Sequence, residues 1–143
     1  LKMIHSIWAY VALAVLIIAV LNACIAIFKK REYSARDLRI SLFALIVSHI
    51  QLIIGLAAYY MSNFYTTMRS IGMGEVMKNA ELRKPLVEHP MMILIAIILI
   101  TIGFSKHKKK STTGGKFRSI AMYYTIGLIL ILAVIPWNLW FSS

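Results

Sequence analysis

The sequence predicts an all-α integral membrane protein in which residues 1–143 form a single four-helix bundle with up-and-down topology. Hydrophobic residues make up 60% of the chain, well above the share of about 45–50% that soluble domains contain. The excess lies in four blocks, each at least about as long as the roughly 20 helical residues that cross a bilayer core. These blocks contain only one charged side chain, that of Glu88, and they cover residues 4–28, 40–61, 86–104 and 120–141.

The basic residues indicate how the bundle is oriented. The formal net charge is +11, and most of the positive charge lies in two connections: residues 29–39 hold five Lys or Arg, and residues 105–118 hold six. Two crossings separate these connections, so both lie on one side, and short loops rich in Lys and Arg stay in the cytoplasm. We therefore expect both termini on the periplasmic side and the cytoplasmic cations against anionic lipid headgroups. No nucleic acid is expected as a partner, because no nucleic-acid-binding motif accompanies the charge.

Two of the four histidines are expected to meet at the outer end of the bundle. His5 opens the first helix and His89 opens the third, and these two helices run in the same direction. First and third helices are usually diagonal neighbours in a four-helix bundle, so a planar cofactor fits between their imidazoles. Two neutral imidazoles are known axial ligands of haem iron. We therefore predict a haem b site with His5 and His89 as the iron ligands.

The other two histidines are expected to play different parts. His49 lies about twelve residues from the outer end of the second helix, hence about 18 Å deep. It is expected to be neutral and hydrogen-bonded, with a structural or redox-tuning role or as ligand of a second haem. Together with Gln51 it also suggests a quinone-handling site. His107 follows the third block among lysines, and we expect it to be solvated and without a role.

Cations of the outer loop stand where haem propionates would emerge, because arginine and lysine pair well with carboxylates. The alternative for each of them is an ordinary contact with lipid headgroups. They are Arg69, Lys78, Arg83 and Lys84. Glu88 either orients an imidazole or is a solvated boundary residue.

Pro90 fixes His89 at a distorted helix entrance, since proline lacks a backbone N–H and disfavours a helical residue before it. If the helix begins at Pro90, His89 is its cap. If it begins at Pro85, Pro90 kinks the first turn and frees a carbonyl.

The second block carries a stripe of small and polar residues at three- and four-residue spacing. Such a stripe lets membrane helices approach closely, and the alternative is the lining of a cofactor edge. It consists of Ser41, Ala44, Ser48, Gln51, Gly55 and Ala58. A zinc site is not expected, because no HxxxH pair or carboxylate cluster supplies three ligands. No nucleophile–base pair or phosphate loop is present either, so whether the chain is an enzyme stays open.

Three stretches carry a family resemblance: "HSIWAYVALAVLI" at 5–17, "HIQLIIGLAAYY" at 49–60 and "VEHPMMILIAIILITIG" at 87–103. Together they resemble small four-helix bacterial membrane proteins of the cytochrome b-like type. More distantly, their order resembles one half of the haem A synthase family. This resemblance implies a bacterial inner (cytoplasmic) membrane location.

In the haem A synthase family, a histidine near the outer end of one helix pairs with a histidine that opens a later one. His5 and His89 occupy the corresponding places, and Gln51 and Gly55 match the helix between them. That family carries a glutamate three residues before its first ligand, where this chain has Lys2. Members of that family are also about twice as long as this chain. The resemblance therefore implies a haem b site and argues against haem A synthesis.

The function that these patterns favour is electron transfer or haem handling, as part of or beside a larger membrane complex such as a respiratory one. The alternative is a cofactor-free accessory or assembly subunit that packs on partner transmembrane helices. A third hypothesis is a quinone-handling redox enzyme that uses His49 and Gln51.

Overall fold

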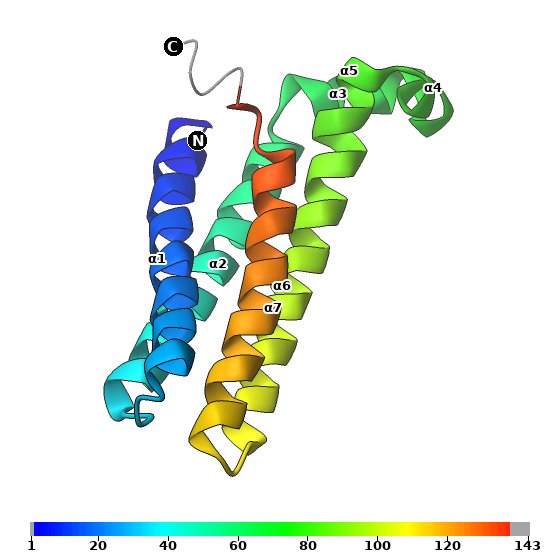
Figure 1. The fold of residues 1–143 in the computed structure, drawn as a ribbon. Coiled ribbons are helices and arrows are strands. Elements are labelled where there is room, and N and C mark those ends of the chain that lie inside the picture. The colour runs from blue at the N-terminus through cyan, green and yellow to red at the C-terminus, as the bar shows by residue number, and fades with distance from the viewer. Residues whose placement is uncertain (1, 138–143) are drawn as a thin grey trace.

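Four long helices and a group of short ones make up the fold in the computed structural model, which describes residues 2–137 (Figure 1). The described part of the chain contains no β-strand. The long helices are α1 (Lys2–Lys29), α2 (Ala35–Tyr60), α6 (His89–Lys109) and α7 (Thr113–Val134). The short ones, between α2 and α6, are α3 (Asn63–Ile71), α4 (Met73–Lys78), α5 (Ala80–Arg83) and the π-helical turn η1 (Lys84–Glu88). Four helical segments, α6 being counted together with α5 and η1, are long and apolar enough to cross a membrane.

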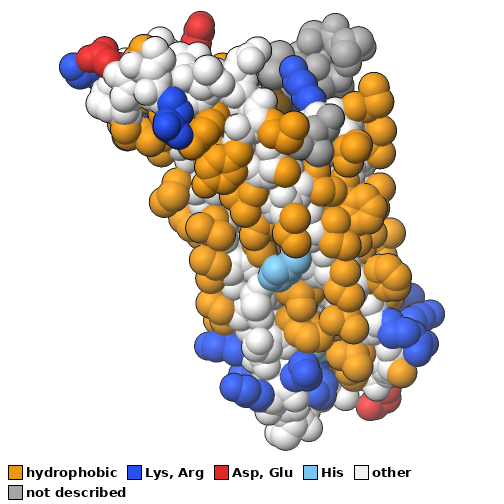
Figure 2. Space-filling model, turned by 180° about the vertical axis from the view of Figure 1, so that it is seen from behind, with side chains coloured by type: hydrophobic (Ala, Val, Ile, Leu, Met, Phe, Trp, Pro, Cys, Tyr) orange, Lys and Arg blue, Asp and Glu red, His pale blue; other side chains and the backbone are white. Residues whose placement is uncertain are grey.

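The long helices alternate in direction, and α1 packs against α2 and α7 while α6 packs against the same two helices (Figure 1). Consequently α1 and α6 are diagonal partners across the bundle, as the sequence predicted. We call the end that carries His5, His89 and α3–α5 the histidine end. The opposite end, where residues 29–39 and 105–118 lie, is the basic end. Figure 2 shows Lys and Arg side chains gathered there below a largely hydrophobic face.

The core is narrow and is built from small residues. Along α1 a stripe at three- and four-residue spacing is buried, namely Ala12, Leu16, Ala19, Ala23 and Ala26. From the stripe predicted on the second helix, Ser41, Ala44 and Ser48 are buried. At most 33% of the most apolar window of each long helix is buried. Most apolar side chains therefore face outward, which is the arrangement that a hydrocarbon solvent favours.

Two glycines allow α6 and α7 to approach closely. A Cβ atom on Gly103 would lie 2.4 Å from the Cβ atom of Tyr123, and one on Gly127 would lie 2.8 Å from a side-chain carbon of Ile100. Close approach through small residues is the usual basis of helix packing where the hydrophobic effect does not drive it.

The helices extend farther into the basic regions than the apolar blocks predicted. Helix α2 begins at Ala35 instead of residue 40, and α6 and α7 leave only residues 110–112 between them. Lysine and arginine are good helix formers, and cations in a last turn interact favourably with the helix dipole. The start of α2 is also capped, since the carboxylate of Asp37 accepts the backbone N–H of Ser34. Helix α7 ends at Val134, just before Pro136, and residues 138–141 of the fourth block lie outside the described residues.

Candidate functional site

His5 and His89 lie side by side at the histidine end. Their ring centres are 6.5 Å apart, and the ring planes are nearly perpendicular, at 83°. The two rings come from the diagonal helices α1 and α6, so they meet across the bundle. The structure thus brings together the two imidazoles that the sequence paired.

His89 is positioned by an irregular helix entrance. Helix α6 continues from α5 through the π-helical turn, in which the His89 backbone N–H bonds to the Lys84 carbonyl. Pro90 has no N–H to offer the carbonyl of Leu86, four residues earlier. The hydroxyl of Tyr59, at the end of α2, donates to that carbonyl at 2.9 Å. His89 is therefore not a cap, because the chain is helical from Ala80 onward and Pro90 lies inside the helix, as in the second alternative, although the helix begins before Pro85. Tyr59 supplies a hydrogen-bond donor to the Leu86 carbonyl.

The ring of His89 is oriented by the end of α7. Its Nδ1 atom lies 2.9 Å from the backbone oxygen of Val134, the last residue of that helix. Carbonyls in the last turn of a helix lack an intrahelical partner. The Nδ1–H group therefore donates to Val134, and the lone pair of the ring is on Nε2, the form in which an imidazole binds a metal.

His5 is held against α2 by Gln51 and Gly55. The Gln51 amide nitrogen lies 3.0 Å from His5 Nδ1 and 3.0 Å from the His5 backbone oxygen. The His5 ring packs on Gly55, where an added Cβ atom would lie 3.2 Å from the ring carbon Cε1. The amide oxygen of Gln51, Oε1, is buried and has no hydrogen-bond partner among the residues that the structure describes. Since buried polar atoms are nearly always paired, this oxygen marks an unsatisfied position beside His5.

The outer-loop cations take different places. The Nε atom of Arg83 pairs with the Glu88 carboxylate at 2.6 Å, and its Nη1 atom donates to the Met77 carbonyl. Glu88 therefore braces the π-helical turn through Arg83. Arg69 is exposed and lies over the ring of Tyr65, and Lys84 is exposed at the first position of the turn.

His49 is hydrogen-bonded, as predicted. Its Nδ1 atom lies 2.8 Å from the carbonyl of Leu45, and its Nε2 atom lies 3.5 Å from the Thr101 hydroxyl on α6. It lies only two residues, about 3 Å of helix rise, from Gln51, which contacts His5. Helix α2 extends beyond the level of His5. The depth of His49, when it is counted from the end of α2, therefore overstates the distance along the helix between His49 and the His5–His89 pair. The ring itself reaches α6 instead of the His5–His89 pair.

The prediction for His107 was wrong. This residue is fully buried, with a relative exposure of 0%, in the last turn of α6. Its Nε2 atom lies 2.8 Å from the hydroxyl of Tyr33, and its Nδ1 atom bonds to the carbonyl of Phe104. The reason is that α6 continues past the apolar block. The spacing of Ala96, Ile100, Gly103 and His107 then keeps the imidazole on the buried face.

A polar cluster that the sequence analysis did not predict lies at the basic end, beside His107. Asp37, 1% exposed, accepts hydrogen bonds from Arg31 and Asn22. Burial first, and then the negative charge of Asp37, raises the pKa of Tyr33 to about 12. An acidic residue three positions after Ser34 was the signal available in the sequence. These contacts tie α1, α2 and α6 together at one end.

No known protein family, no curated protein and no solved structure matches this chain. The resemblance to cytochrome b-like proteins therefore stays a prediction from the residues. Within residues 2–137, no three His, Cys, Asp or Glu side chains converge on a point that would hold a metal ion. Two imidazoles are nevertheless enough for haem, because the porphyrin supplies the other four ligands of the iron.

Proposed function

We propose that this chain is a membrane-embedded haem-binding protein of the b-type cytochrome class, with His5 and His89 as the axial ligands of one haem b. The spacing of the two rings carries this proposal. A bond of about 2.0 Å from a metal to an imidazole nitrogen, and about 1.1 Å from that nitrogen to the ring centre, places two rings on one iron about 6.2 Å apart. The ring centres of His5 and His89 are 6.5 Å apart. Perpendicular planes are allowed, since each ring turns about its own bond to the iron.

The contacts behind the two rings also support haem. Histidines that bind a metal usually engage their second nitrogen in a hydrogen bond, which sets the tautomer and the ring orientation. His89 Nδ1 has the Val134 carbonyl, and His5 Nδ1 has the Gln51 side chain. If the Gln51 amide turns over, Oε1 accepts from His5 Nδ1–H and the orphaned oxygen gains a partner. The amide then gives up its bond to the His5 carbonyl, and His5 presents the Nε2 lone pair to the iron.

Membrane insertion completes the proposal. With the basic end in the cytoplasm of a bacterial inner membrane, both chain termini face the periplasm and the histidine pair lies near the periplasmic surface. Arg69 and Lys84 would be available to the propionates there, whereas Arg83 is engaged by Glu88. A haem so placed would supply a one-electron redox couple, and the residues around it would hold the two imidazoles in position. We propose electron transfer or haem handling in or beside a larger membrane complex, with quinone as a candidate partner.

An absorption spectrum distinguishes this function from its main alternative. The protein is produced with a haem precursor in the medium, purified in detergent, and measured in its oxidised and dithionite-reduced forms. We expect a Soret band, a sharp α-band on reduction, and one haem for each chain. A colourless protein that also fails to take up added haem contradicts the proposal. The chain would then be a cofactor-free accessory subunit, whose apolar faces pack on partner helices.

A further inference from the structure

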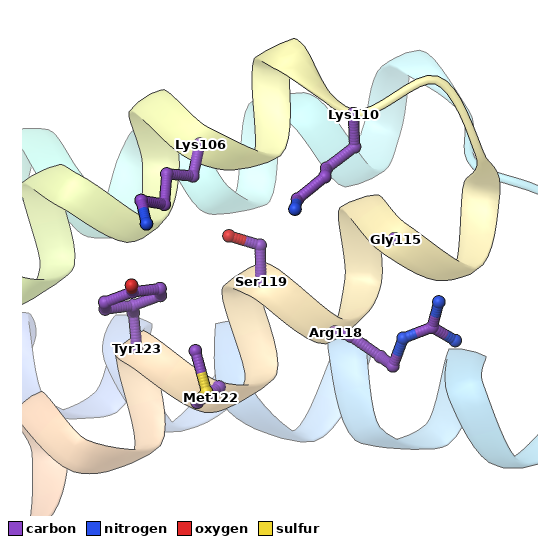
Figure 3. Close-up of a pocket in the computed structure, with 7 residues that line it drawn as sticks. All are labelled: Lys106, Lys110, Gly115, Arg118, Ser119, Met122 and Tyr123. Carbon is purple, nitrogen blue, oxygen red and sulfur yellow. The ribbon is translucent and has the colours of Figure 1, made fainter.

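A basic cavity lies between α6 and α7 at the basic end (Figure 3). Its volume is about 230 Å³. Figure 3 shows Lys106, on α6, and Lys110, which directly follows α6, reaching toward α7, where Tyr123 and Ser119 face them. The Lys106 ammonium group lies 5.8 Å from the centre of the Tyr123 ring, so a cation–π contact holds it over one wall of the cavity. The lining residues are Lys106, Lys110, Gly115, Arg118, Ser119, Met122 and Tyr123.

Within residues 2–137, no carboxylate neutralises the positive charge of this cavity. Lys106, Lys110 and Arg118 form no ion pair with any carboxylate in the described part of the chain. Of the acidic residues, only Glu32 and Asp37 lie at this end. Asp37 is engaged by Arg31, and Glu32 accepts the hydroxyl of Thr113. Three cations around one hollow therefore lack an anionic partner.

A shallow apolar hollow, widely open to its surroundings, adjoins the basic cavity and shares two of its residues, Arg118 and Met122. It lies where α1 and α7 meet. Apart from Arg118 and Thr125, its lining is apolar: Ile27, Ala121, Met122 and Ile126. Along α7, from Arg118 to Ile126, the surface changes from cationic to apolar within about two helical turns, which is roughly 12 Å of rise.

We propose that these two hollows form a binding site for one anionic phospholipid. The phosphate occupies the basic cavity, where charge-assisted hydrogen bonds from lysine and arginine satisfy it. An acyl chain follows the apolar hollow along α7. Basic recesses between transmembrane helices at the cytoplasmic face are typical binding places for such headgroups. This inference rests on the membrane insertion proposed above and is independent of haem.

Paired variants test the headgroup part. Binding of phosphatidylglycerol to the purified full chain in neutral detergent is titrated by native mass spectrometry, with phosphatidylcholine and inorganic phosphate as further probes. The variant Lys106→Gln/Lys110→Gln removes two cations of the cavity. The control Lys108→Gln/Lys109→Gln removes the same charge from exposed neighbours that do not line it.

We expect phosphatidylglycerol to bind the wild type and the control with similar affinity. Its affinity for the cavity variant should be about 30-fold lower, because each cation near a lipid phosphate contributes roughly a factor of five. Phosphatidylcholine and inorganic phosphate should both bind far more weakly than phosphatidylglycerol. An equal loss in the two double variants would show general surface attraction and overturn the site. Binding of inorganic phosphate as tight as that of the lipid would show a plain anion site and would also overturn it.

A second pair of variants tests the acyl chain and leaves the cations intact. Ile126→Trp fills the apolar hollow from a position that is 42% exposed, and Ile129→Trp adds the same bulk at a 58% exposed position outside it. We expect the affinity for phosphatidylglycerol to fall several-fold in Ile126→Trp and to stay unchanged in Ile129→Trp. Equal affinities in the two variants would show that no acyl chain lies in this hollow and would refute the proposal.

Discussion

Replacing Tyr59 by phenylalanine removes only the hydroxyl that donates to the Leu86 carbonyl. Leu86 is 3% exposed, and Pro90 has no N–H to offer its carbonyl. A buried acceptor without a partner costs about 1–3 kcal/mol, and hydrogen bonds within membranes measure about 0.6 kcal/mol on average with a maximum near 1.7. We therefore expect Tyr59→Phe to lower the free energy of unfolding by about 1–2 kcal/mol, measured by SDS titration and circular dichroism in mixed micelles.

Two further variants make this prediction specific. Tyr60→Phe is the matched control, because Tyr60 is 60% exposed and its hydroxyl makes no hydrogen bond in the described part of the chain. It should change the stability by less than about 0.5 kcal/mol. Pro90→Ala restores a backbone N–H four residues after Leu86, so Tyr59→Phe should cost about 1 kcal/mol less in that background. Equal costs of Tyr59→Phe in both backgrounds would refute the reasoning about the freed carbonyl.

The remaining predictions concern packing and pH. Gly103→Ala should lower the free energy of unfolding by about 1–3 kcal/mol, because its Cβ atom would lie 2.4 Å from that of Tyr123 and the two helices would have to separate. Gly74→Ala is the control, because an added Cβ atom there would meet no other atom within 4 Å, and it should be neutral or stabilising by up to about 1 kcal/mol. If Gly103→Ala has wild-type stability in the same SDS titration, the close contact between Gly103 and Tyr123 is contradicted. Tyr33 has its pKa raised from 10.0 to about 12. Above pH 10 the unfolded chain therefore loses this proton before the folded one, and stability falls as pH rises through that window. Tyr33→Phe should show a smaller fall when unfolding is measured at several values between pH 9 and 12, and an unchanged slope would show that Tyr33 does not contribute.

The sequence alone predicted the long helices and the proximity of the two outer histidines. The thickness of a hydrocarbon core sets the length of an apolar block, and helices that run in the same direction bring His5 and His89 to one end. Contacts that depend on the offset between neighbouring helices could not be predicted from the sequence. Gln51 reaches His5 because α2 extends beyond the start of α1, an offset that block lengths do not encode.

The positions of the helix ends were also not predicted correctly from the sequence. His107 was misplaced because a drop in hydropathy was taken as the end of a helix, while lysines continue the helix readily. The spacing from Ile100 through Gly103 was the available signal for its burial. Similarly, Pro90 indicates that a carbonyl is freed, but its donor, Tyr59, lies on another helix and 31 positions earlier in the chain.

The central claim is that His5 and His89 hold one iron, and the haem spectrum of single-histidine variants tests it most directly. The oxidised and reduced spectra and the haem content are measured for purified His5→Ala, His89→Ala and His49→Ala. We predict that either of the first two loses the low-spin spectrum, whereas His49→Ala keeps it, because its ring faces Thr101 on α6. A haem content that falls from two to one in His49→Ala would instead assign a second haem to His49. An unchanged haem spectrum in both His5→Ala and His89→Ala would contradict the site.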